Sequence, residues 1–310
     1  MPARPTRRQV LFGAAGTVGV AAVAATGVLL DQEVPGPSAQ RVPGPRRLAP
    51  GDAVVSTEWV VSSARNRPVR LVLAVPPGAD RAALPVVLGL HGLGGNALWW
   101  QDPGNRRLLG QAWGLGVPPF VLAAVDGGDN YWHPFRAGDD PRRMLLDELP
   151  GWLRARGVGT VPASGMRPGE PAEVLGISMG GAGALMYARA RGQQGHPVAA
   201  VAAVSPGLFT DWRVASRRPF AGPADWEAND PLRFYPELAD TPTGMWSGDR
   251  DPFVDAVRRY LVLARPEVGV VSPGRHDGPF YSRVLPDVLT FLGRHLPPPA
   301  IAALRPVGFG

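Results

Sequence analysis

Short apolar runs alternate with longer amphipathic patterns from residue 57 onward, and this alternation limits the possible folds more than any other feature of the sequence. A short run without polar alternation, such as residues 85–90 (PVVLGL), is typical of a strand buried on both faces. Strands that alternate with helices predict the α/β class, with a doubly wound, mainly parallel sheet. Functional sites in such sheets lie at the carboxyl ends of the strands.

We expect strands at residues 58–62 and 69–75, as an opening antiparallel pair, and then at 85–90, 120–125, 174–177, 198–204, 243–246 and 268–271. The expected helices cover residues 140–156, 179–191, 252–264 and 279–295.

The chain divides by composition into a targeting segment, a linker, one domain and a tail. Residues 1–30 carry the pair Arg7-Arg8 followed by an uncharged stretch rich in Gly and Ala, which predicts a twin-arginine export signal or a membrane anchor. Cleavage and retention of this segment both stay open. Residues 31–50 contain five prolines and predict an extended linker. Residues 51–298 then form the α/β domain, with 206–242 as a cap-like insertion and 299–310 as a tail.

Composition excludes several classes of chemistry. The chain has no cysteine, so disulfides, a thiolate nucleophile and Cys-ligated zinc or iron–sulfur centres are impossible. Its formal net charge is +6, but the arginines are scattered and no basic run is interleaved with aromatic residues, so we expect no nucleic-acid partner. No close His spacing of the metalloprotease kind exists, and we expect neither a metal nor a cofactor.

The strongest motif is Gly176-Ile177-Ser178-Met179-Gly180, which has the G-x-S-x-G form between an expected strand and an expected helix. A sharp turn there exposes the Ser178 hydroxyl at the sheet edge and directs the helix N-terminus at a developing anion. We predict that Ser178 is a nucleophile. In the alternative, Ser178 merely caps the helix in a Gly-rich turn.

A second motif, His91-Gly92-Leu93-Gly94-Gly95, directly follows the apolar run at 85–90. Such a turn commonly supplies one backbone N–H of an oxyanion hole, and the residue after the nucleophile supplies the other. We therefore assign the two donors to the N–H groups of Leu93 and Met179. His91 is expected to hold the loop rather than to act as a base.

The remaining partners should follow in the order Ser, Asp, His. His276 lies between the last expected strand and the last helix, which is the position of a general base. Two acids follow the strand at 243–246, and Asp251 is favoured over Asp249 because it lies at the mouth of the next helix. Asp249 has the alternative role of a turn residue. His133 follows another strand end and is expected to be a pocket residue.

Several segments in order resemble one family. Residues 126–132 (DGGDNYW), 145–153 (LLDELPGWL) and 225–231 (DWEANDP) are similar to segments of the esterase family of α/β-hydrolases. That family includes esterase D-like S-formylglutathione hydrolases, feruloyl esterases and secreted mycolyltransferases. The resemblance implies the α/β-hydrolase fold for residues 51–298, with Ser178 as nucleophile, Asp251 as acid and His276 as base.

Two departures favour a general esterase over a mycolyltransferase: His91 stands where those enzymes have Asp, and Asp251 stands where they have Glu. We predict an exported serine carboxylic-ester hydrolase that forms an acyl-enzyme. The alternatives are an acyltransferase acting on a sugar hydroxyl and a non-catalytic binding protein. The expected partner is an ester of a lipid or an acylated sugar, and membrane contact is expected only through residues 1–30. The candidate substrate contacts are His91, Trp132, His133, Trp212 and Trp226.

Overall fold

The computed structural model describes residues 51–162 and 165–298. The expected export signal, the linker and the tail therefore lie outside the described residues. In the part of the chain that is described, no helix has both the length and the apolar content needed to cross a bilayer.

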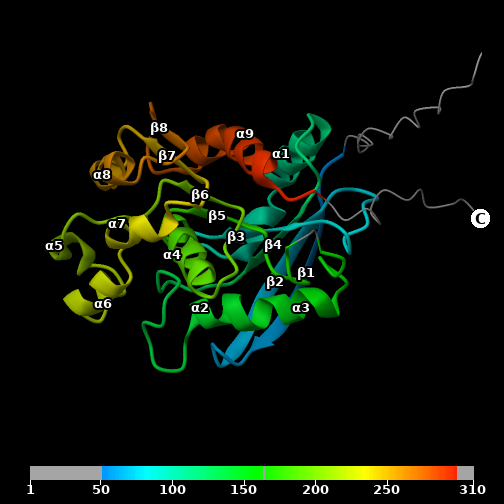
Figure 1. Cartoon of the computed structure of the whole chain (residues 1–310), viewed down its shortest axis with the longest axis horizontal. Coiled ribbons are helices and arrows are strands. Elements are labelled where there is room, and N and C mark those ends of the chain that lie inside the picture. The colour runs from blue at the N-terminus through cyan, green and yellow to red at the C-terminus, as the bar shows by residue number, and fades with distance from the viewer. Residues whose placement is uncertain (1–50, 163–164, 299–310) are drawn as a thin grey trace, which may run out of the picture. The chain divides into compact units, whose positions relative to one another are not determined.

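An eight-stranded sheet forms the centre of the domain, in the order β1-β2-β4-β3-β5-β6-β7-β8 (Figure 1). The strands β1 and β2 pair antiparallel, β2 also pairs antiparallel with β4, and the remaining pairs are parallel. This confirms the predicted fold class. The bounds are Val54–Ser62 (β1), Arg67–Val75 (β2), Val86–Leu90 (β3), Val121–Val125 (β4), Glu173–Ile177 (β5), Ala200–Val204 (β6), Thr243–Gly248 (β7) and Val268–Ser272 (β8).

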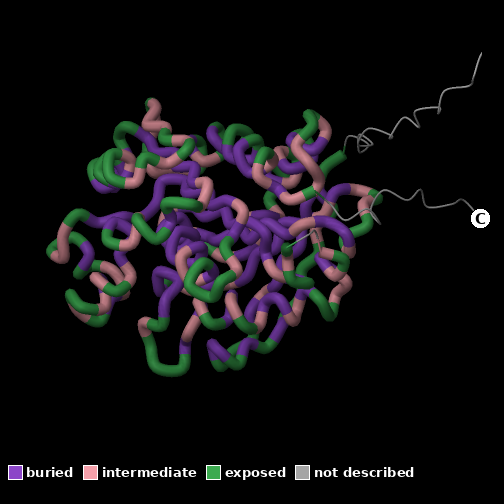
Figure 2. Tube along the Cα trace, in the orientation of Figure 1, coloured by how far each residue is buried: buried purple, intermediate pink, exposed green. Residues whose placement is uncertain are grey.

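The central strands are buried over their whole length because helices cover both faces of the sheet. Every residue of β3, β4, β5, β6 and β7 is buried, as the continuous apolar runs predicted (Figure 2). One face packs against α1 (Pro103–Gly114) and α9 (Gly278–His295). The other face packs against α3 (Leu149–Ala155), α4 (Met179–Gln193) and α8 (Val254–Ala264).

The helix expected at residues 140–156 is present but contains a wider turn. It consists of α2 (Pro141–Arg143), a π-helical turn η2 (Met144–Glu148) and α3. At the end of the wide turn, the Glu148 carboxylate accepts hydrogen bonds from Ser62 Oγ at 2.6 Å and from the Ala64 N–H at 2.8 Å. This helical stretch thus fixes the hairpin between β1 and β2.

The insertion at residues 206–242 contains the short helices α5 (Trp212–Ala215), α6 (Pro223–Ala228) and α7 (Pro231–Phe234), followed by a 3₁₀ turn η3 (Tyr235–Leu238). It leaves the sheet after β6 and returns at β7, and η3 and α7 pack against α4 (Figure 1). The helix α1 and the preceding 3₁₀ turn η1 (Ala97–Gln101) were not predicted. Both lie between β3 and β4.

Candidate active site

Ser178 occupies a strained turn between β5 and α4. Its backbone has φ 57° and ψ −119°, a conformation that L-residues other than glycine rarely adopt. The turn is fixed on both sides, because the Ser178 N–H donates to the Val204 carbonyl at 2.8 Å and the Ser178 carbonyl accepts from the Gly207 N–H at 2.8 Å. These contacts hold the backbone of Ser178 in the strained conformation.

Two glycines make this turn possible. A β-carbon at Gly176 would collide with the carbonyl oxygen of Gly180, and one at Gly180 would collide with the carbonyl oxygen of Leu90 on β3. The first contact lets β5 and α4 approach each other closely. The second lets α4 pack against the neighbouring strand β3. The spacing of the G-x-S-x-G motif therefore follows from backbone contacts around the serine.

His276 lies in the loop between β8 and α9 and contacts Ser178 directly. Its Nε2 is 2.8 Å from Ser178 Oγ, and its Nδ1 is 2.8 Å from Asp251 Oδ2. The imidazole is held at its edges by Phe253 and Tyr281, whose ring centroids lie 5.1 Å and 5.7 Å away in T-shaped contacts. Hydrogen bonding from Nδ1–H to the carboxylate leaves Nε2 free to accept the serine proton.

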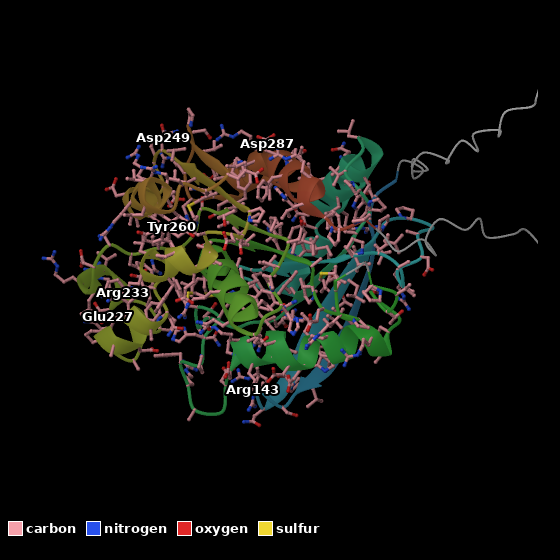
Figure 3. All side chains as sticks on the ribbon, viewed as in Figure 1. Arg143, Glu227, Arg233, Asp249, Tyr260 and Asp287 are labelled. Atoms are coloured by element: carbon pink, nitrogen blue, oxygen red, sulfur yellow. The ribbon has the colours of Figure 1, made fainter. Side chains whose placement is uncertain are left out.

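The two candidate acids occupy different positions in the loop after β7. Asp251 is 2% exposed; besides His276 it accepts a hydrogen bond from the Phe253 N–H at 2.8 Å through Oδ1. Asp249 is exposed at the surface (Figure 3) and accepts from the Gly274 N–H at 2.9 Å. Asp249 thus ties the β7 loop to the β8 loop, whereas Asp251 contacts the imidazole.

The loop after β3 approaches the serine from the other side. A β-carbon at Gly92 would lie 3.2 Å from Ser178 Cβ and 3.7 Å from Ser178 Oγ. The next residue is Leu93, and its N–H and that of Met179 donate to no acceptor among the described residues. The structure therefore brings both expected oxyanion positions next to Ser178, with hydrogen-bonding capacity left over.

His91 holds that loop, as its sequence position suggested. Its Nε2 accepts from the Gly127 N–H at 2.9 Å, and its Nδ1 lies 2.8 Å from the Gly92 carbonyl, so Nδ1 carries the proton. Burial lowers the pKa of His91, which keeps the ring neutral and able to accept from Gly127. Asp129 adds a second tie, because its carboxylate accepts from the Gly94 N–H at 2.6 Å.

Trp132, which we expected to touch substrate, is part of the core. Its side chain is 1% exposed, fills the space left by the missing side chains of Gly127 and Gly183, and donates from Nε1 to the His91 carbonyl at 3.2 Å. The assignments of Trp132 and His91 as substrate contacts are therefore corrected. Both side chains lie inside the protein and hold the loop after β3 by hydrogen bonds, so neither faces a substrate.

His133 is likewise buried, and its assignment as a pocket residue is corrected. It is 0% exposed, its Nε2 lies 3.2 Å from Asp225 Oδ2 on α6, and its ring stacks on Phe220 at 5.1 Å. Burial lowers its pKa. The contact joins the loop after β4 to the insertion.

Trp226 is also buried, at 7% exposed, so it is no open sugar platform and its assignment is corrected too. Trp212, in contrast, is partly exposed and packs against the core beside Trp226. Trp212 is the one candidate substrate contact of the five that is partly exposed, and its side chain forms no hydrogen bond among the described residues.

Sequence reasoning assigned no role in the site to Tyr131 or to Phe253, which pack in one group of aromatic rings. Phe209 contacts both Tyr131 and Phe253 at 5.6 Å, and Phe220 contacts Tyr131 at 5.3 Å. Tyr131 has φ 52° and its N–H lies 3.3 Å from Met179 Sδ, so it is held beside the nucleophile. These rings come from separated segments, and no local pattern in the sequence unites them.

The structure also has a cavity that lies away from the serine. A cavity of about 220 Å³ is lined by Tyr235, Tyr260 and the segments that precede β7 and β8, and is therefore at the amino ends of those strands. Among residues 51–162 and 165–298, no three His, Asp or Glu side chains gather as a metal site requires.

The chain is similar to known proteins in sequence and in fold. A family model described as "Putative esterase" matches residues 62–256. A solved ferulic acid esterase has a TM-score of 0.65 and 18% identity, and the match covers 79% of this chain and 99% of that one. An S-formylglutathione hydrolase from Agrobacterium tumefaciens has a TM-score of 0.61 and 19% identity, and the match covers 79% of this chain and 96% of that one.

A substrate-bound fluorophosphonate-binding serine hydrolase of Staphylococcus aureus has a TM-score of 0.60 and 15% identity, covering 78% of this chain and 99% of that one. Comparison with curated protein sequences gave no match. The structural similarities show the α/β-hydrolase fold, and the family match extends over more than half of the chain. The chain therefore belongs to the esterase family of α/β-hydrolases.

Proposed function

We propose that the protein hydrolyses carboxylic esters through a covalent acyl-enzyme on Ser178. Membership of the esterase family supports a hydrolase, and one observation supports the mechanism. This is the continuous chain of hydrogen bonds from Ser178 Oγ to His276 Nε2 and from His276 Nδ1 to Asp251, each 2.8 Å long. Such a chain activates a serine hydroxyl because the imidazole takes its proton during attack.

In the proposed reaction, Ser178 Oγ attacks the ester carbonyl carbon while its proton moves to His276 Nε2. Asp251 keeps Nδ1 protonated and stabilises the imidazolium. The tetrahedral intermediate then collapses, the bond to the alcohol oxygen breaks, and His276 returns the proton to the departing alcohol. Water attacks the acyl-enzyme by the same steps in reverse and releases the acid.

The negative charge on the carbonyl oxygen is stabilised by the N–H groups of Leu93 and Met179. Met179 is also the first residue of α4, so the positive end of the helix dipole lies beside the same oxygen. Removal of one oxyanion donor typically lowers kcat by about 10²–10³-fold. No cofactor or metal takes part in the proposed steps.

Water is the main acceptor in this proposal, rather than a sugar hydroxyl. Both departures from the mycolyltransferase pattern, His91 and Asp251, lie in the site itself. The rings of Phe209, Phe220 and Trp226, all in the insertion, are buried in the core and offer no open face on which a sugar could stack. Added glycerol in the assay below tests transfer, because an acylated glycerol product requires an alcohol to compete with water.

The decisive variant is Ser178→Ala. We expect it to abolish hydrolysis of p-nitrophenyl acetate and butyrate and to lose labelling by a fluorophosphonate probe, while its melting temperature stays close to that of the parent. Labelling or turnover that persists in Ser178→Ala would place the nucleophile elsewhere. A parent protein that neither turns over an ester nor reacts with the probe would favour the non-catalytic alternative.

We also propose that the enzyme works outside the cytoplasmic membrane, after export through the twin-arginine route. The support is the pair Arg7-Arg8 before an uncharged Gly- and Ala-rich stretch. The double substitution Arg7→Lys and Arg8→Lys should block export, because this pathway depends on the arginine pair itself. Fractionation of cells that express the full chain measures the effect, and unchanged export would contradict the twin-arginine route.

A further inference from the structure

Arg218 occupies a fixed turn directly after α5. Its N–H donates to the Ala215 carbonyl at 2.9 Å, and its carbonyl accepts from the Phe220 N–H at 2.7 Å. Phe220 is itself buried among aromatic rings, so the backbone of Arg218 is anchored to the core next to the proposed site. The turn therefore fixes the position from which the Arg218 side chain begins.

The Arg218 guanidinium lies over the ring of Phe253, 5.7 Å from its centroid. The same ring contacts the His276 imidazole at 5.1 Å, and the backbone N–H of Phe253 binds Asp251. A positive charge thus lies one aromatic ring away from the proposed general base. Cation–π contact orients the guanidinium but does not neutralise its charge.

Arg218 also has no counter-ion among the described residues. Two other arginines of the insertion have one, because Arg213 pairs with Asp211 and Arg233 pairs with Glu227 at 2.9 Å (Figure 3), whereas Arg217, like Arg218, forms no ion pair among the described residues. The Arg218 side chain forms neither an ion pair nor a hydrogen bond within residues 51–162 and 165–298, and it is partly exposed. Its hydrogen-bond donors are therefore available to a ligand.

Tyr131 offers a hydroxyl in the same region. A β-carbon at Gly207 would lie 3.0 Å from Tyr131 Oη and 3.5 Å from the Met179 nitrogen, so the phenol oxygen and the Met179 N–H both lie close to Gly207. Burial raises the pKa of Tyr131 to about 12, against the smaller opposing effect of the Arg218 charge. The phenol therefore stays protonated and able to donate at neutral pH.

We propose that Arg218 makes this enzyme select esters that carry a negative charge close to the scissile bond, with Tyr131 Oη as a second donor to the anionic group. The proposal rests on the proposed ester hydrolysis at Ser178. A carboxylate suits both donors, because guanidinium binds it with two parallel hydrogen bonds and a phenol can add a third.

The charge can reside on the acyl part or on the alcohol part of the ester, and two substrate pairs distinguish these sources. The first pair is mono-p-nitrophenyl succinate and p-nitrophenyl 4-methylpentanoate, which match in shape but differ in charge on the acyl side. The second pair is 4-acetoxybenzoate and 4-acetoxybenzamide, which differ in charge on the leaving group. The measured quantity is the ratio of kcat/KM for the anionic ester to that for its neutral partner, with turnover by Ser178→Ala subtracted as background.

We expect the parent to prefer the anionic member of at least one pair, and Arg218→Gln to lower that ratio by about 10- to 100-fold, as loss of a hydrogen bond to a charged group predicts. Arg218→Lys should retain part of the preference, and about 0.5 M NaCl should weaken it in the parent. Arg217→Gln is the matched control, because it removes the neighbouring exposed arginine, for which no ring contact is found among the described residues. It should leave both ratios unchanged.

Equal ratios in the parent and in Arg218→Gln for both pairs would overturn the inference and reduce Arg218 to a packing contact on Phe253. An equal loss of ratio in Arg217→Gln would also overturn it, because a general positive field would then explain the preference. Failure of the underlying function gives a different result, since the parent would then hydrolyse neither the neutral nor the anionic esters. Unchanged melting temperatures exclude unfolding as the cause of a lower ratio.

Discussion

Asp251 and Glu173 are both buried carboxylic acids, and they lie at opposite ends of the parallel strands of the same sheet. Asp251 follows the carboxyl end of β7 and accepts hydrogen bonds from His276 and from the Phe253 N–H. Glu173 is the first residue of β5, is 0% exposed, and neither of its oxygens has a partner among the described residues. The two carboxyl groups are equally buried, but that of Asp251 is hydrogen-bonded and that of Glu173 is not.

The difference follows from what each edge of the sheet offers. In the sheet, Glu173 lies in register with Val87 on one neighbouring strand and Ala200 on the other, and its surroundings are apolar. Burial accordingly raises its pKa well above the ordinary value, because an apolar environment favours the neutral acid over the carboxylate. At the carboxyl edge, loops supply backbone N–H groups and an imidazole that compensate a negative charge.

The comparison teaches how a buried acid can be identified as functional. Burial by itself does not distinguish the two residues, and neither does the carboxyl group that they share. The distinction lies in the hydrogen bonds that the Asp251 carboxyl group forms with His276 and with the Phe253 N–H, whereas the Glu173 carboxyl group has no such bond among the described residues. The following substitutions test this contrast, and the larger effect comes first.

Asp251→Asn tests the acid at the carboxyl ends of the strands and should have the largest effect. An amide in place of the carboxylate can no longer stabilise the imidazolium and can donate to Nδ1, which favours the wrong tautomer of His276. We expect kcat for p-nitrophenyl butyrate to fall by about 10⁴-fold with little change in melting temperature.

Asp249→Asn is the matched control in the same loop. Its carboxylate accepts from the Gly274 N–H, and the Asn carbonyl can keep that bond. We expect a loss of less than about tenfold, since the loop contact survives. A larger loss in Asp249→Asn than in Asp251→Asn would transfer the role of the acid to Asp249.

Glu173→Gln tests the acid at the amino end of β5. We expect it to change the pH dependence of the free energy of unfolding rather than the turnover. The folded-state pKa of Glu173 lies above its unfolded value, so the unfolded chain releases the proton first as pH rises. The folded state of the parent therefore loses stability with increasing pH from the unfolded pKa of about 4.5 up to the folded pKa, by at most about 1.4 kcal/mol per pH unit. The amide side chain of the variant has no proton to release and should remove this dependence.

The measurement is the free energy of unfolding in urea at pH 5 and pH 7, for the parent and for Glu173→Gln. We expect the difference between the variant and the parent to shift in favour of the variant, by at most about 2.8 kcal/mol between the two pH values. Activity per folded molecule should stay the same in both proteins. Parallel stability profiles would show that Glu173 is ionised in the folded state and would remove the contrast with Asp251.

Much of the sheet could be predicted because its central strands are continuous apolar runs in the sequence, which is typical of strands buried on both faces. The apolar runs at β3, β4 and β6 need no knowledge of their neighbours, since covering both faces of a strand requires an apolar residue at every position. The helix α1 escaped prediction because its three glycines weaken the helical pattern. Asp102 as N-cap with Pro103 at the first position was the signal that could have found it.

The site was predictable where a local motif enforces the geometry, and not where distant segments meet. Gly176 and Gly180 mark the turn at Ser178 because close backbone contacts exclude side chains there. Trp132 and His133 follow a strand end, which suggested an exposed pocket, but packing against Gly183 and Phe220 buries them. Arg218 had no sequence signal, because its significance depends on Phe253 and His276, which are far along the chain.

The turn at Ser178 also has a consequence for how the enzyme folds. Its conformation depends on the Val204 carbonyl of β6 and on the close approach of Gly180 to Leu90 of β3, and its partner His276 lies 98 residues further along the chain. Contacts of such long range form slowly, because a large loop must close before they contribute. Recovery of turnover during refolding therefore reports completion of the whole sheet from β3 to β8, whereas recovery of helical signal can precede it.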